Sequence, residues 1–185
     1  MDGFFALGLA LAITHAHLEP VAQHDKPKWY ITTSAGRAVA DFLGSEDPRR
    51  HNSFGIAYAR REPKLRFRNL KAELVTEAYY ERSMSPGASQ QPPNRTDAWG
   101  LMTYARYRKG LLFFDIGWGT QYVDQRTVDL SGRLNSSPNF TIGVSLDSAE
   151  RELLVGLRLM HISNAGLQGN NQGVNQVSIF AALRF

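Results

Sequence analysis

The chain has 185 residues, which is enough for one domain with a buried core or for a small closed barrel. It contains no cysteine, and this excludes a disulfide framework and a thiolate metal site. The 21 Lys and Arg residues and the 17 Asp and Glu residues give a net charge of +4, but the basic residues are scattered, which supports nucleic-acid binding only weakly and is compatible with an anionic lipid surface.

The N-terminus carries a short apolar run, Phe4 to Ile13, followed by Thr14-His15-Ala16, which is similar to a small-residue cleavage site. This pattern predicts a secretory signal peptide over residues 1–16 and a single mature domain over residues 17–185. The region before the run has Asp2 and no basic residue, so a buried N-terminal helix is the alternative. No other apolar run approaches the ~18 residues of a transmembrane helix, so a membrane protein with this sequence would have to be a barrel.

After Pro27 the chain alternates apolar and polar residues in segments separated by turn-rich stretches, and no stretch has a 3.6-residue period. Eight β-strands are therefore expected. In chain order they are Trp29–Val39, Ser53–Arg60, Leu65–Glu81, Asp97–Arg108, Leu111–Trp118, Phe140–Leu146, Leu153–Ser163 and Asn175–Phe185.

The predicted connections alternate in length. Those after the second, fourth and sixth strands are short (61–64, 109–110 and 147–151), and those after the first, third, fifth and seventh are longer (42–52, 82–96, 121–139 and 164–174). Short periplasmic turns and long extracellular loops are typical of bacterial outer-membrane barrels with an even strand number. The fold prediction is therefore all-β, an eight-stranded antiparallel transmembrane β-barrel.

Charged residues within the strands support the same choice. They stand opposite the apolar series and would line the interior, which eight strands leave just wide enough for side chains to fill: Lys71, Glu73, Glu77, Arg106, Asp115 and Arg158. Trp and Tyr residues near the strand ends are typical of an aromatic girdle. The alternative is a soluble, lipocalin-like barrel with the two faces reversed.

His161 and Ser163 stand two residues apart at the end of the seventh strand, on the same face as Leu157 and Leu159. A serine nucleophile needs an adjacent base, and the base needs a group that orients its ring. The hairpin formed with the last strand can bring Asn175 beside His161, although an amide cannot supply the charge of a carboxylate. The pair alone is a weak motif, since a His and a Ser at a strand end are usually structural.

The run His161-Ile162-Ser163-Asn164-Ala165-Gly166-Leu167, with Asn171, Gly173 and the C-terminal Phe185, resembles the outer-membrane lipid A 3-O-deacylases of the PagL family. The resemblance implies a serine esterase of the outer membrane that removes the acyl chain ester-linked at position 3 of lipid A, with no metal and no cofactor. It also implies that His161 is the base and Ser163 the nucleophile, and that Asn164, Ala165 and Gly166 stabilise the oxyanion. The family has a Glu at the position of Asn175.

The expected partners are lipid A, as part of lipopolysaccharide, and other outer-membrane lipids, with a homodimer left open and no nucleic acid. Basic residues in the long loops are candidates for contacts with lipid A phosphates: Arg49, Arg50, Arg82, Arg95 and Arg126. The alternative function is a non-catalytic or substrate-shifted barrel with a structural or binding role, because Asn175 replaces the family's Glu.

Overall fold

In a computed structural model of the protein, residues 26–39, 47–68, 70–87, 92–147, 151–167 and 173–185 are described. They form nine strands: β1 (Lys28–Ala38), β2 (Arg50–Phe67), β3 (Leu70–Ser85), β4 (Asn94–Lys109), β5 (Leu112–Val123), β6 (Leu134–Ser136), β7 (Asn139–Asp147), β8 (Glu152–Ile162) and β9 (Val174–Arg184). Within the described ranges, no helix is long and apolar enough to cross a membrane. The predicted signal peptide, residues 1–16, lies outside the described residues.

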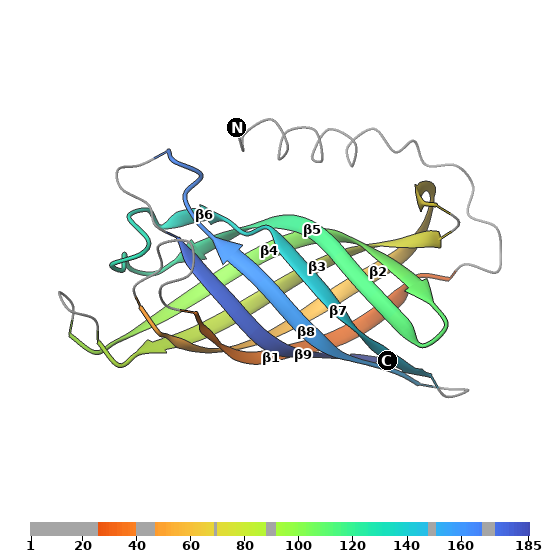
Figure 1. Cartoon of the computed structure of the whole chain (residues 1–185), viewed down its shortest axis with the longest axis horizontal. Helices are drawn as coiled ribbons and strands as arrows, with labels where there is room; N and C mark the ends of the chain where they lie inside the picture. The colour runs from red at the N-terminus through yellow and green to blue at the C-terminus, as the bar shows by residue number, and fades with distance from the viewer. Residues whose placement is uncertain (1–25, 40–46, 69, 88–91, 148–150, 168–172) are drawn as a thin grey trace.

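The strands form one antiparallel sheet in the order β4-β3-β2-β1-β9-β8-β7-β5, and pairing of β4 with β5 closes it into a barrel (Figure 1). Two of the nine strands occupy one place in the wall. β7 pairs with the first half of β5, up to Gly117. The short β6 pairs with β5 from Thr120 to Tyr122 and is bridged to Ser163 just after β8. The eight-stranded antiparallel barrel predicted from the sequence is thus confirmed.

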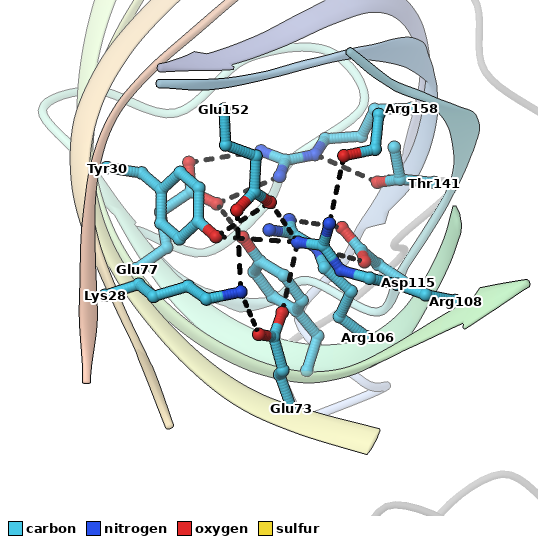
Figure 2. Close-up of polar contacts among 12 residues, drawn as sticks. Lys28, Tyr30, Glu73, Glu77, Arg106, Arg108, Asp115, Thr141, Glu152 and Arg158 are labelled. Carbon is cyan, nitrogen blue, oxygen red and sulfur yellow. Dashed lines mark hydrogen bonds and ion pairs between the residues drawn. The ribbon is translucent and has the colours of Figure 1, made fainter. Parts of the chain in front are cut away.

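The interior of the barrel holds paired charged and polar side chains (Figure 2), which pack among buried apolar and aromatic ones such as Tyr104, Phe113 and Phe180. Glu77 binds Arg158 at 2.9 Å, and Arg106 binds Asp115 through two hydrogen bonds of 2.8 and 2.9 Å. The predicted polar lining is confirmed except at Lys71, whose side chain lies outside what the structure describes. Charges inside overturn the alternative of a barrel with reversed faces.

A third ionic group closes the end of the interior where the short turns and the C-terminus lie (Figure 1). Arg108 bonds both Glu73 and Glu152, and Lys28 bonds Glu73 at 2.7 Å (Figure 2). Buried charges are tolerated only when they are paired, and these pairs join strands from different parts of the wall. The barrel is therefore a packed body and not an open pore.

The outer face is apolar and carries aromatic side chains toward both ends of the strands. On one side, neighbouring registers place Phe54, Tyr80, Trp99 and Tyr122 in a row across β2 to β5. Toward the other end, Phe67, Tyr107 and Phe114 form a cluster, with Tyr107 and Phe114 stacked at 4.9 Å between ring centroids. Aromatic residues at both ends of an apolar band are typical of membrane-spanning barrels.

Two predicted connections differ most from those in the structure. The expected turn at 61–64 is wrong, because β2 continues to Phe67 and the chain reverses at Arg68, whose φ is 53°. Pro63 instead lies where the pairing of β2 with β3 shifts register, and a residue without an N–H is tolerated at such a bulge. The expected loop 121–139 is shorter, since β5 extends to Val123 and β6 forms within it.

Candidate active site

The β8–β9 hairpin places His161 directly opposite Asn175 at the end of the barrel that carries the long connections. Along β8, Leu157 and Leu159 are exposed on the outer face, while Arg158 and Met160 are buried in the interior. His161 follows the outward series. The pairing predicted from the hairpin is therefore present, and it lies on the outer wall of the barrel.

A hydrogen bond joins the two side chains, with His161 Nδ1 2.8 Å from Asn175 Oδ1. A carboxamide oxygen can only accept, so the proton of this bond belongs to Nδ1 of the imidazole. Nε2 of the neutral ring is then unprotonated and available to accept a proton. This is the tautomer that a general base acting through Nε2 requires.

Gly173 packs against the other edge of the imidazole. Its φ is +78°, and a β-carbon built on it would lie 2.6 Å from His161 Cε1 and 3.1 Å from His161 Nε2. The N–H of Gly173 donates to the backbone oxygen of Asp129 at 3.0 Å, which fixes the segment in this position. The ring is thus held between Asn175 on one side and a bare glycine α-carbon on the other.

Ser163 follows the last residue of β8 and is held by the short strand β6. Its N–H donates to Ser136 O at 3.0 Å, and its own carbonyl accepts from the N–H and the hydroxyl of Ser136 at 2.6 and 3.1 Å. The residue is only 8% exposed. Among the described residues, no hydrogen bond joins the Ser163 hydroxyl to the His161 ring, and in enzymes without bound substrate such bonds are often long.

The three residues after Ser163 form a tight turn. Ala165 and Gly166 have φ values of 55° and 76°, and a left-handed conformation at a residue with a side chain is uncommon. The side chain of Asn164 holds this turn, because its Oδ1 accepts from the N–H of Gly166 at 2.9 Å and its Nδ2 donates to Ser131 Oγ at 2.8 Å. Backbone strain of this kind is often stored at functional sites.

Three residues that contact the candidate site come from the stretch between β5 and β7, for which the sequence predicts a loop. Asp129 binds the backbone of Gly173, Ser131 binds Asn164, and Ser136 binds Ser163. These are single polar residues in a segment without a chemical motif, so the sequence carries no signal for their contacts. Only the closure of the barrel brings this segment beside the end of β8.

The interior side of the same strands is held by Arg158. Its guanidinium bonds Glu77 across the barrel at 2.9 and 3.3 Å and lies 4.0 Å from the ring centroid of Phe180 on β9. Arg158 is three residues from His161, and it ties both strands of the hairpin to the interior. His161 and Asn175 therefore lie on two strands that are anchored to the barrel interior, and such anchoring supports the precise geometry that catalysis requires.

The candidate phosphate contacts divide into two groups. Arg49 is 4% exposed and points into the barrel, where it bonds Asp47 at 2.7 Å, so its predicted place at the lipid surface is wrong. Arg50, Arg82, Arg95 and Arg126 are exposed. No group of three or more His, Asp or Glu side chains among the described residues is arranged to hold a metal ion.

Comparisons with known proteins give a family and a fold. The sequence model of the lipid A 3-O-deacylase (PagL) family matches residues 76–184, which is more than half of the chain. The crystal structure of the outer membrane enzyme PagL superposes with a TM-score of 0.58 at 15% identity, covering 83% of this chain and 97% of that one. The crystal structure of Neisserial surface protein A superposes with a TM-score of 0.52 at 16% identity, covering 85% and 95%. No curated protein matches the sequence.

Proposed function

Because the chain belongs to the lipid A 3-O-deacylase (PagL) family and is an outer-membrane β-barrel, we propose that it hydrolyses the acyl ester at position 3 of lipid A. The observation that carries the proposal is the 2.8 Å hydrogen bond between His161 Nδ1 and Asn175 Oδ1 on the outer wall. This bond leaves Nε2 of His161 available as a base, two residues along the chain from Ser163. In this proposal residues 1–16 are a signal peptide that directs the barrel, residues 17–185, to the outer membrane.

Ser163 is the nucleophile and His161 the base. As the Ser163 hydroxyl attacks the ester carbonyl, Nε2 of His161 accepts its proton, and a tetrahedral intermediate with a negatively charged oxygen forms. When the intermediate collapses, the bond to the sugar oxygen breaks and the proton on Nε2 passes to that oxygen. Water then attacks the acyl-serine by the same route and releases the fatty acid.

Two groups support these steps. Asn175 keeps the His161 ring in the tautomer with Nδ1 protonated, which is a positioning role that an amide oxygen can perform without a charge. The turn Asn164–Gly166 follows the nucleophile directly, and we assign stabilisation of the oxyanion to it. Donors aimed at a developing oxyanion contribute about 3 to 4 kcal/mol each.

The position of the pair suits a substrate embedded in a lipid leaflet. The outer face of β8 is apolar up to Leu159, and His161 follows at the end of the strand where the long connections begin. In outer-membrane barrels this end faces the cell exterior, where the outer leaflet holds lipopolysaccharide. An acyl ester at the boundary between chains and headgroup can therefore reach Ser163 without leaving the membrane.

The proposal is tested with purified protein and lipopolysaccharide in detergent, with the lipid A product analysed by mass spectrometry. Loss of one ester-linked acyl chain, together with release of the free fatty acid, is the expected result. Ser163→Ala should abolish it, whereas Ser53→Ala, which removes a β2 hydroxyl that bonds Ser34 and no other described residue, should not. A folded wild-type protein that leaves lipid A intact would refute the proposal and favour a non-catalytic barrel.

A further inference from the structure

Two arginines lie directly opposite each other on the outer wall near the candidate active site. Arg37 of β1 pairs with Arg50 of β2, and both side chains are exposed. Opposed residues in an antiparallel ladder have β-carbons about 5 Å apart, and like charges in this arrangement repel each other. Among the described residues neither guanidinium has an ion-pair partner. The wall thus presents two adjacent positive charges that nothing in this part of the protein neutralises.

Two other exposed arginines on neighbouring strands of this side of the wall are already paired. Arg82 of β3 and Arg95 of β4 both bind Asp97, at 3.1 and 2.6 Å. Asp97 also accepts a hydrogen bond from Tyr80 at 2.5 Å. The two arginine groups therefore have the same charge and the same outward direction, but only Arg37 and Arg50 lack an acid.

Strand order places the unpaired arginines beside the site. β1 pairs with β9, where the N–H of Val39 donates to Asn175 O at 2.8 Å and Arg37 stands opposite Val177. Arg37 is therefore diagonal to Asn175, a relation in which β-carbons are about 7 to 8 Å apart. Arg50 lies one strand further, about 4.8 Å along the wall. An anion held by both arginines would be within the span of one lipid headgroup from His161.

We propose that Arg37 and Arg50 together bind a phosphate group of the lipid A headgroup and thereby position the scissile ester at Ser163. A phosphate carries up to two negative charges and several acceptor oxygens, and guanidinium groups bind it bidentately. Bridging by one phosphate removes the repulsion between the two arginines. This inference rests on the proposed deacylation, because it assigns the substrate's headgroup a place next to that site.

The binding test uses the Ser163→Ala protein, so that no substrate is consumed. Its affinity for lipid A carrying both phosphates is measured in detergent micelles, with and without the double substitution Arg37→Gln/Arg50→Gln. The double substitution Arg82→Gln/Arg95→Gln is the matched control, since it removes the same charge from the same rim of the wall. Lipid A stripped of its phosphates serves as the second ligand, and heat-modifiable migration in gels verifies that each variant is folded.

We expect the Arg37/Arg50 variant to bind phosphorylated lipid A roughly 100-fold more weakly, about tenfold for each arginine, and the control to bind it nearly as well as the parent. The affinity for stripped lipid A should be the same in all three proteins. Unchanged affinity in the Arg37/Arg50 variant would overturn the inference, and so would an equal loss in the control or on stripped lipid.

A kinetic measurement separates this inference from the proposed function. In the protein with Ser163 intact, the Arg37/Arg50 substitution should raise KM for phosphorylated lipid A and leave the rate on stripped lipid A unchanged. If the wild type hydrolyses neither lipid, the proposed function fails, while the binding comparison still decides whether the arginine pair holds a phosphate. If hydrolysis occurs and KM does not respond, the phosphate assignment fails and the deacylase stands.

Discussion

Gly173 presents its bare α-carbon to the His161 ring, so that a β-carbon at this position would lie 2.6 Å from Cε1 of the imidazole. Gly110, in the turn between β4 and β5 at the opposite end of the barrel, also has a positive φ, +59° against +78°, but open space around it. Both glycines therefore have a left-handed backbone, and of the two only Gly173 contacts the ring.

Gly173→Ala should displace the imidazole from its bond with Asn175 and lower kcat/KM by about 10²-fold, since a misplacement of about 1 Å costs that much in an aligned site. Gly110→Ala should cost a similar amount of stability, about 1 to 2 kcal/mol, because both alanines would be left-handed, but should retain activity because this turn lies at the other end of the barrel. The measurements are kcat/KM and the free energy of unfolding for each variant. Equal losses of activity in both variants would mean that backbone strain alone is responsible.

Ser163→Ala and His161→Ala should each reduce ester hydrolysis by about 10³-fold or more, because nucleophile and base act as a unit. Neither side chain contributes to the ionic interior, so both variants should still fold and show heat-modifiable migration in detergent gels. Hydrolysis rates on lipopolysaccharide check the prediction. Near wild-type activity in either folded variant would place the chemistry elsewhere on the barrel.

Asn175→Ala removes the acceptor that holds His161 Nδ1 and should reduce turnover by about 10²-fold. Asn175→Glu supplies the carboxylate that the family resemblance implies at this position and should preserve or raise turnover. A carboxylate beside the ring favours the protonated imidazole, so the acid limb of the pH–rate profile should move to higher pH. An active Glu variant whose acid limb has not moved would show that position 175 does not contact the base in the working enzyme.

Glu77→Ala should destabilise the barrel by about 3 to 5 kcal/mol, because it leaves the buried guanidinium of Arg158 without its partner. Arg82→Ala is the control, since the pair of Arg82 with Asp97 is exposed to solvent and contributes little to stability. Denaturant unfolding in detergent, followed by circular dichroism, measures both. A small effect of Glu77→Ala would mean that water neutralises the interior charge.

The alternating pattern was sufficient to predict the barrel because each strand has one lipid-facing side and one interior side. The hairpin pairing of His161 with Asn175 followed from the same period, since two strands joined by one loop have few possible registers. The turn at 61–64 was misplaced because Pro63 and its charged neighbours have turn composition, and the sequence does not reveal that a bulge absorbs them. The position of Ser163 was only partly predictable, because it depends on Ser136 of β6, a strand of three residues.

The contacts that surround the candidate site were not predictable for a related reason. Asp129, Ser131 and Ser136 reach it from a segment whose path depends on closure of the whole wall, and no local pattern encodes closure. The outward arginines were recognised by type, but Arg49 and Arg50 are adjacent in sequence and face opposite sides of the wall. A shift of one residue in the start of β2 would have exchanged their roles.

The pair formed by Glu77 and Arg158 also has a consequence for how the barrel assembles. The two residues are 81 positions apart, on β3 and β8, and they meet only across the completed interior. In a partly assembled sheet that lacks β8, Glu77 would keep its hydrogen bonds from Thr32 and Tyr104 but lose its counter-charge. Such an intermediate is electrostatically unfavourable, which favours cooperative closure of the wall.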